Sequence, residues 1–327
     1  VEDNTTDSER ETRITVSAGE AEQQIRINQL APDNEFVRFR KLDTFSQGAV
    51  LSPNGKYAGG FISSIAPDDS FQYAPTFVNI ETGEWTQFGP YPEAVHYLTQ
   101  ALCISDQGLL FISDGYNGGQ IAINLNGDIF IPEAPEGFQF KPQIEAVSAD
   151  GKYWVGYAVN ESTLRGGLYH PLLWTDGVPE VLPMPDKNFR NQEFTTGIMA
   201  RGISANGEII YGTSWENDDC GMLYWKNNGT TVEEPRWVGD DIRRLTPVIV
   251  EDWMGEYEYN LVDGCICTAE ITKVSPSGKW IATTYRTEEP NEGGMSFSIT
   301  QTPAFYNTET ETTIIVDEYS DSTGMYV

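Results

Sequence analysis

Apolar and polar residues alternate in short runs along most of this 327-residue chain. Runs such as 75–80, 120–125 and 171–175 have the two-residue period that is typical of strands with one buried face. Asn-Gly at 126–127 and Asp-Gly at 176–177 follow two of these runs. These steps are strong hairpin signals, because both turn positions favour a positive φ. The pattern therefore predicts an all-β protein built from hairpins.

One short phrase recurs five times: an apolar residue, Ser, two turn formers, Gly, and then an apolar strand. Its serines are Ser52, Ser105, Ser148, Ser204 and Ser275. A period near 50 residues indicates an array of supersecondary units. Each unit reads as four antiparallel strands, which is the blade of a β-propeller. The phrase glycine fills the turn between the first two strands, and a strand rather than a phosphate-binding helix follows it.

The two ends of the chain predict how the ring closes. Residues 322–327 resemble the approach to the first strand of copy four at 196–200, so a sixth blade begins there. The alternating runs at 13–17, 24–28 and 36–41 would supply its remaining strands. Closure from both termini would give six blades without exposed sheet edges. The alternative is a fragment whose further blades follow residue 327.

These patterns predict two parts of the chain. Residues 1–12 are polar and charged and form a tail or tether, and residues 13–327 form the propeller. No apolar run approaches the ~20 residues that span a bilayer. The chain starts without an initiator Met, and a signal peptide or lipid-anchored cysteine before Val1 is a hypothesis that the sequence leaves open.

The net charge of −29, from 49 acidic and 20 basic residues, repels nucleic acids and anionic membrane surfaces. It either keeps the protein soluble or attracts a cation or a basic partner.

Cysteine and metal signals are weak. Cys103 is expected in the core. Cys265 and Cys267 would share one face of a strand, and a disulfide from Cys220 to either stays open. Neither of the two histidines has a ligand-spaced partner. We expect no cofactor, although the oxygen-rich loops at 67–70 and 216–219 offer Ca²⁺ ligands without the twelve-residue calcium-loop pattern.

Loop lengths differ between the two faces of the predicted ring. Turns after first and third strands are short, whereas loops after second and fourth strands are long. The long loops are 63–73, 89–98, 133–143, 158–169, 183–198, 233–264 and 286–300. Both long sets emerge on one face of an antiparallel meander, and binding residues concentrate on such loops. The longest, 233–264, is expected to hold one short helix.

Candidate ligand-binding residues lie on these loops and near the ring axis. Those on the loop face are Tyr91, His96, Tyr116, Arg165, Tyr169, Trp215, Trp253, Tyr257 and Arg286. Exposed aromatic residues stack on sugars or anchor protein partners, although they also pack loops together. Near the axis, Glu145 and Arg201 each stand three residues before a phrase serine. We predict an ion pair between them, with a structural role favoured over ligand contact, and assign no catalytic residue.

The phrase, with strands ending in Trp-Thr-Asp-Gly or Tyr-Trp-x-Asn-Asn-Gly, resembles TolB-like propeller repeats and a related secreted bacterial repeat. The match is clearest at 144–176 and 200–229. The resemblance implies an extracytoplasmic binding or scaffold protein, at the cell surface or in the periplasm. Its partner would be a glycan, a peptide or an envelope protein. The alternatives are a glycoside hydrolase or lyase with carboxylates at the central channel, and an accessory subunit of an outer-membrane assembly.

Overall fold

A computed structural model describes residues 10–18, 21–29, 45, 49–93, 95–115, 119–138, 140–160, 168–216, 219–252, 255–267, 272–290 and 297–316. It divides the chain into two units, Val1–Thr44 and Phe45–Val327. The described residues form strands and turns without a helix. They confirm the prediction of an all-β fold.

The first unit contains an antiparallel hairpin of β1 (Arg10–Ala18) and β2 (Ala21–Gln29). The strands expected at 13–17 and 24–28 are therefore present. β1 begins at Arg10, inside the segment assigned to the tail. The run at 36–41 and the approach at 322–327 lie outside the described residues. Closure of a six-bladed ring stays a prediction.

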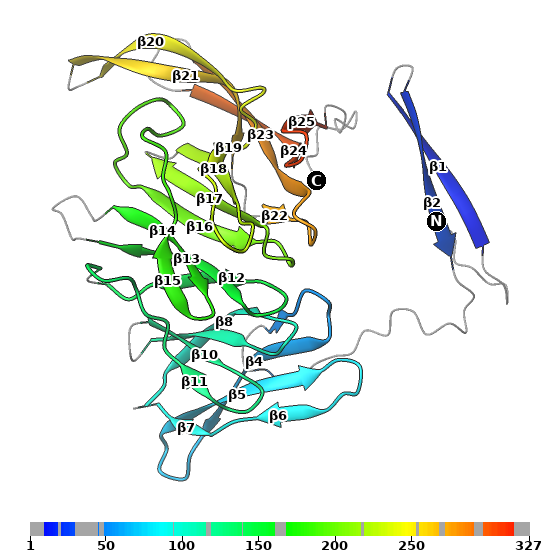
Figure 1. Ribbon diagram of the computed structural model, residues 1–327, viewed down its shortest axis with the longest axis vertical. Helices are drawn as coiled ribbons and strands as arrows, with labels where there is room; N and C mark the ends of the chain where they lie inside the picture. Colours follow the sequence, from blue (N-terminus) through cyan, green and yellow to red (C-terminus); the bar gives the residue numbers. More distant parts are fainter. Residues whose placement is uncertain are drawn as a thin grey trace. The chain divides into compact units, whose positions relative to one another are not determined.

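The second unit contains five meandering groups of four antiparallel strands (Figure 1). Blade one is β3 (Val50–Leu51), β4 (Tyr57–Ile65), β5 (Phe71–Asn79) and β6 (Trp85–Gln87), with β7 (Tyr91–Pro92) added along β5. Blade two is β8 (Leu98–Ile104), β9 (Leu110–Asp114), β10 (Gly119–Ile123) and β11 (Ile129–Phe130). Blade three is β12 (Gln143–Val147), β13 (Tyr153–Val159), β14 (Tyr169–Thr175) and β15 (Val178–Val181).

Blade four is β16 (Ile198–Ile203), β17 (Ile209–Glu216), β18 (Asp219–Lys226) and β19 (Arg236–Trp237). Blade five is β22 (Lys273–Val274), β23 (Trp280–Pro290), β24 (Phe297–Asn307) and β25 (Thr312–Ile315). Four-stranded meanders that follow one another in this way make the second unit a β-propeller.

Each phrase serine closes the turn between the first two strands of its blade. In blade three, Ser148 Oγ donates to Asp150 Oδ1 at 2.6 Å and accepts the Tyr153 backbone N–H at 3.0 Å. Gly151 has a φ of 77°, a conformation that favours glycine. The phrase is thus a closed turn with its own hydrogen bonds.

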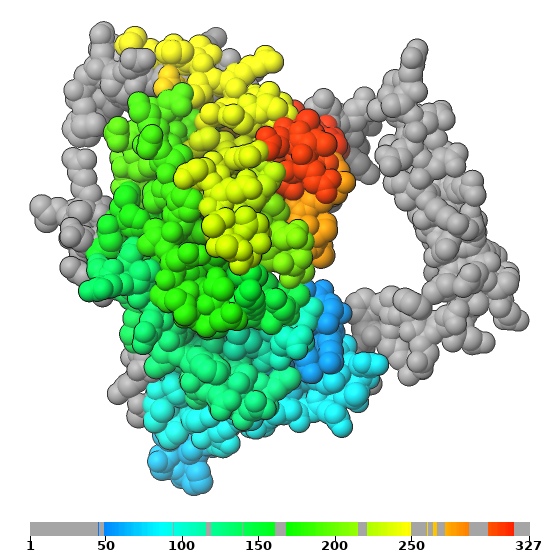
Figure 2. Space-filling view, in the orientation of Figure 1, coloured from blue at the N-terminus to red at the C-terminus, as the bar shows by residue number. Residues whose placement is uncertain are grey.

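The phrases also join the blades to one another. Their hydrogen bonds run from Asn54 N–H to Asp106 Oδ1, from Asp106 N–H to Ala149 O, from Ala149 N–H to Ala205 O, and from Asn206 N–H to Pro276 O. Blades that are neighbours in sequence are therefore neighbours in space, as the ordered colours over the surface of this unit show (Figure 2).

The core is divided into layers between successive blades. One apolar cluster joins blades one and two, and others join two to three, three to four and four to five. The indoles of Trp174 and Trp225, both fully buried, donate to the carbonyls of Glu133 and Pro183 at 2.8 Å. Each tryptophan thereby anchors the connection that enters its blade.

The longest insertion differs from the expectation. Its described part forms a hairpin of β20 (Arg244–Asp252) and β21 (Gly255–Cys267) instead of a short helix. The end of β21 pairs with β18 and with β23, which stabilises extended backbone at this place.

The fourth strand of blade four is β19, and the segment after the Asn-Asn-Gly turn contributes one bridge between Asn227 and Val232. Much of the predicted loops 63–73 and 286–300 is strand, because β4–β5 and β23–β24 pair far beyond the blade centre.

Candidate functional site

The two ends of the blades differ as predicted except in blade four, where the connection after β18 (227–235) is longer than the connection after β17 (217–218). At one end, short turns such as 52–56, 148–152 and 176–177 join the strands, and we call this the short-turn face. The other end, the long-loop face, carries the extended β4–β5 hairpin, the connections between blades and the β20–β21 insertion. Side chains that differ from blade to blade therefore concentrate on the long-loop face.

Connections on the long-loop face are fixed to one another. Arg190, only 2% exposed, lies in the connection between blades three and four and donates to the carbonyl of Asn260 in β21. Asn260 Nδ2 returns a hydrogen bond to the Arg190 carbonyl at 2.8 Å. Arg243 donates to the carbonyl of Phe189 at 3.1 Å. These bonds hold the two connections in one arrangement before any partner binds.

The innermost strands carry a bulge at equivalent positions. The register of β8 against β9 skips Leu102, that of β12 against β13 skips Glu145, and that of β16 against β17 skips Arg201. All three stand three residues before their phrase serine. A bulge re-aims the side chain of its extra residue, which makes this position suited to function.

Glu145 and Arg201 form the predicted ion pair, with 3.2 Å between Arg201 Nη1 and Glu145 Oε1. Both side chains remain partly exposed, 29% for Glu145 and 28% for Arg201. The Arg201 guanidinium also lies 5.6 Å from the ring centre of Tyr157, which packs edge-on against Tyr169. We call these four residues the axial cluster.

Burial and the charges of the axial cluster shift the pKa values of three acidic groups in or near it. Burial raises the pKa of Glu145 above its ordinary value, while the Arg201 guanidinium acts in the opposite direction. Burial and the nearby Glu145 raise the pKa of Tyr211 to about 12. Burial and the same carboxylate raise the pKa of the Cys103 thiol. A carboxylate with a raised pKa and a specific charge partner is a candidate functional group.

A second cluster lies on the long-loop face of blades one and two. His96 Nδ1 is 2.8 Å from Asp114 Oδ2, and Asp114 is almost fully buried at the end of β9. Tyr91 packs edge-on against His96. Asp114 also accepts the Tyr97 backbone N–H at 3.1 Å, so it fixes the direction of segment 95–97.

Four exposed apolar side chains lie on the β4–β5 hairpin and on the segment that carries His96. Ile65 is 65% exposed, Phe71 47%, Val95 49% and Tyr97 41%, and we call these four the apolar patch. Ile65 and Phe71 are direct cross-strand partners at the tip of the β4–β5 hairpin. The Glu93 N–H bonds to the Phe71 carbonyl at 3.0 Å, which ties the segment before Val95 to that hairpin.

The structure does not describe the side chains of five of the six remaining predicted residues. Tyr116, Arg165 and Trp253 lie outside the described residues. Trp215 lies in β17 opposite Cys220 and Tyr257 lies in β21, and only their backbones are described. Arg286 lies in β23 opposite Cys265 and is half-buried. Their proposed roles in ligand binding stay predictions.

Sequence reasoning missed Asp114 and Tyr157. Asp114 follows an apolar strand, and nothing in the local pattern links it to His96. Tyr157 faces Gln143 in the register just beyond the bulge at Glu145, a pairing that the local sequence pattern does not show.

Cys265 is buried, and the predicted alternatives for a disulfide from Cys220 stay open. The side chains of Cys220 and Cys267 are not described.

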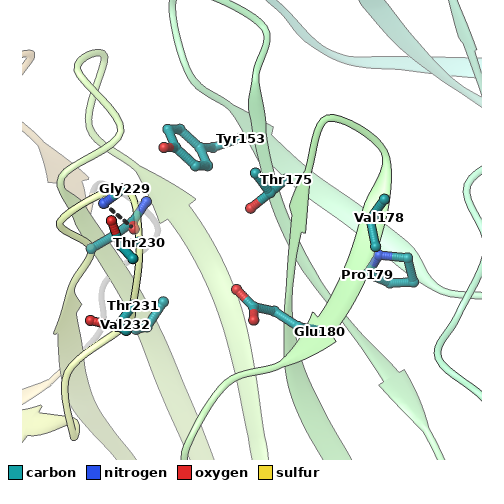
Figure 3. A pocket seen from close by; sticks show the side chains of 10 residues that line it. Tyr153, Thr175, Val178, Pro179, Glu180, Gly229, Thr230, Thr231 and Val232 are labelled. Carbon is teal, nitrogen blue, oxygen red and sulfur yellow. Dashed lines mark hydrogen bonds between the residues drawn. The ribbon is translucent and has the colours of Figure 1, made fainter.

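Two pockets lie at the short-turn face, between successive blades. The first, between blades three and four, has a volume of about 250 Å³ (Figure 3). The second, between blades four and five, has a volume of about 340 Å³. The first is bounded by β14 and β15 of blade three and the turn at 229–232 of blade four, and the second by the short-turn ends of β17 and β18 in blade four and two turns of blade five.

Within the described part of the chain, no group of three or more His, Cys, Asp or Glu side chains could hold a metal ion. In the oxygen-rich loop at 67–70, Asp68 Oδ1 accepts the hydroxyl and backbone N–H of Ser70. Among the described residues, no helix is long and apolar enough to cross a membrane.

No family model and no curated protein matches this chain. Weak similarity to solved structures extends over most of it. A putative TolB from Agrobacterium tumefaciens is 12% identical with a TM-score of 0.41, covering 82% of this chain and 79% of that one. An oligogalacturonate lyase from Vibrio parahaemolyticus is 10% identical with a TM-score of 0.38, covering 95% and 86%.

A putative dipeptidyl aminopeptidase IV from Bacteroides ovatus is 10% identical with a TM-score of 0.43. This chain spans 46% of that protein, and 95% of this chain is covered. The fold class follows from the strand topology described above: the second unit is a β-propeller of four-stranded blades.

Proposed function

We propose that this protein is a non-enzymatic extracytoplasmic propeller that binds a peptide or envelope protein through its long-loop face. The observation that supports this most directly is the apolar patch. Exposed apolar side chains that lie together beside a fixed polar pair are typical of a protein-binding surface.

The composition of the patch favours a protein over a glycan as its partner. Sugar rings stack on flat aromatic faces, whereas Ile65 and Val95 offer branched aliphatic surface. Protein interfaces combine both kinds of side chain at their centre and keep charged groups at the rim. The extracytoplasmic location rests on the resemblance of the repeats to exported propellers.

The proposal is tested by photo-crosslinking in cells that express the full chain. A photoreactive amino acid replaces Tyr97 in the patch or, as a control, Ile314 on the outer strand β25, which is 51% exposed. A discrete crosslinked protein from position 97 and none from position 314 is expected, and Val95→Asp should abolish the product. Equal products from both positions, or none from position 97, would contradict the proposal.

One observation favours an enzyme instead. The raised pKa of Glu145 is what a general acid requires. Glycoside hydrolysis, however, uses a pair of carboxyl groups, and the bulge position next to Glu145 supplies Arg201. Incubation with plant, bacterial and host polysaccharides should release no reducing ends. Release that Glu145→Gln abolishes would establish the enzymatic alternative.

A further inference from the structure

The pocket between blades three and four is made by two walls and a floor. One wall is the end of β14 with the start of β15, which brings Thr175, Val178, Pro179 and Glu180 to the pocket. The other wall is the turn at 229–232 of blade four. Tyr153 and Asn227, both buried, complete its lining. None of these residues belongs to the axial cluster or the apolar patch.

The blade-four wall is built independently of any ligand. Asn227 donates to the Gly207 carbonyl at 3.0 Å and accepts the Gly229 N–H at 3.0 Å. Asn228 accepts the N–H groups of Thr230 and Thr231 and donates to the Thr231 hydroxyl at 3.1 Å. A wall fixed in this way loses little conformational entropy when a ligand binds.

Several polar groups of the pocket remain available. The Glu180 carboxylate points into the space between the walls, toward Thr231 (Figure 3). Among the described residues, neither this carboxylate nor the hydroxyls of Thr175 and Thr230 has a hydrogen-bond or ion-pair partner. The site thus offers one strong acceptor and two hydroxyls that donate or accept. Val178, Pro179 and Val232 add apolar surface beside them.

We propose that this pocket binds one ring of a neutral sugar. Adjacent sugar hydroxyls would donate to the two oxygens of Glu180, and the threonine hydroxyls would complete the hydrogen bonding. The C–H edge of the ring would lie on the Val178–Pro179 side. A volume of about 250 Å³ falls just below the ~300–1,000 Å³ of sites for drug-sized ligands, which suits a single ring.

The charge of the site defines which sugars fit. A uronic acid or a sugar phosphate would place an anion beside Glu180, on a chain with a net charge of −29. A simple ammonium ligand would use the carboxylate and leave the two hydroxyls without partners. The combination of groups therefore selects a neutral polyhydroxyl ring.

The neighbouring pocket between blades four and five provides a contrast at the equivalent place. It is lined by Lys226, Lys279 and Glu309, among others. Lys279 pairs with Glu309 at 2.8 Å, and Lys226 pairs with Glu311 at 3.6 Å. Because these charges pair within the protein, this pocket supplies a matched control for the first.

Isothermal titration and saturation-transfer NMR test the proposal on the full chain. The probes are glucose, galactose, mannose and N-acetylglucosamine, with glucuronate and ethanolamine as charged comparisons. At least one neutral sugar should bind, and Glu180→Gln should weaken it about tenfold or more, because a hydrogen bond to a charged group is lost. Thr175→Val should also weaken binding.

Glu309→Gln and Tyr97→Ala should leave sugar affinity unchanged. The second control separates this proposal from the partner site on the long-loop face. Glu180 is exposed, so its variant should unfold at the same temperature as the parent protein. The proposal is overturned if no neutral sugar binds, if Glu180→Gln binds as tightly as the parent protein, or if glucuronate or ethanolamine binds best.

Discussion

Replacing Ser148 with alanine removes the hydroxyl on which one phrase depends. Ser148 has 0% exposure. Its oxygen accepts the N–H of Tyr153 at 3.0 Å and donates to the carboxylate of Asp150 at 2.6 Å. Alanine fits the space but leaves the Tyr153 N–H without this acceptor inside the protein.

The size of the effect follows from these two bonds. A buried donor left unsatisfied costs about 1–3 kcal/mol, and a hydrogen bond to a charged group contributes about 1.5–3 kcal/mol. Because Asp150 regains water when its partner is lost, the sum should stay near 2–4 kcal/mol. The matched control is Ser277→Ala in the blade-five phrase. Ser277 is exposed, and its hydroxyl makes two long contacts, 3.4 Å from the Lys279 N–H and 3.5 Å from the Ser275 hydroxyl, so a change within about 0.5 kcal/mol is expected.

Urea unfolding followed by circular dichroism measures both variants at one protein concentration. The midpoint for Ser148→Ala should fall without a change in the denaturant slope, whereas the control should superimpose on the parent protein. A loss below 0.5 kcal/mol for Ser148→Ala would refute the view that the phrase holds the turn.

Three other predictions concern the blades and the axis. Gly156→Ala should prevent folding or lower stability by several kcal/mol, since the new methyl would lie 1.8 Å from the Gln143 carbonyl oxygen; soluble yield and thermal unfolding measure this. Burial lowers the pKa of His170, so the unfolded chain binds the proton more tightly than the folded protein does. Stability should therefore fall as the pH drops below about 6.5. His170→Phe should reduce this loss of stability when unfolding is measured from pH 7 to pH 5. Arg201→Met leaves the partly buried Glu145 without its cation and should lower the free energy of unfolding by about 1 kcal/mol at pH 7. The loss should be smaller at pH 4, where the carboxyl is protonated. Adding Glu145→Gln should recover the stability lost at pH 7.

The parts of this fold that could be predicted from sequence depend on local signals. The five phrases and the Asn-Gly and Asp-Gly turns fix strand order because each acts within a few residues. Repeat equivalence also extended to the axis, where placing Glu145 and Arg201 at one position was enough to predict their ion pair. The β20–β21 hairpin was missed because contacts remote in sequence stabilise it, through the pairing of Cys265–Cys267 with β18 and β23. Asp114 was missed for the same reason. Its contact with His96 forms because the connection between blades one and two lies against the end of β9.

The repeated bulge frees one position in each of three successive blades from the constraints of regular strand pairing. A residue in regular pairing must fit one face of its blade, so its size and polarity are constrained by the layer it packs against. The bulged residue escapes that constraint, and leucine, glutamate and arginine occupy it in three successive blades. The phrase serines of the same blades are fully buried and make the same turn bonds. Changes in a phrase should therefore alter unfolding and leave partner affinity intact, whereas changes at the apolar patch should affect affinity far more than stability.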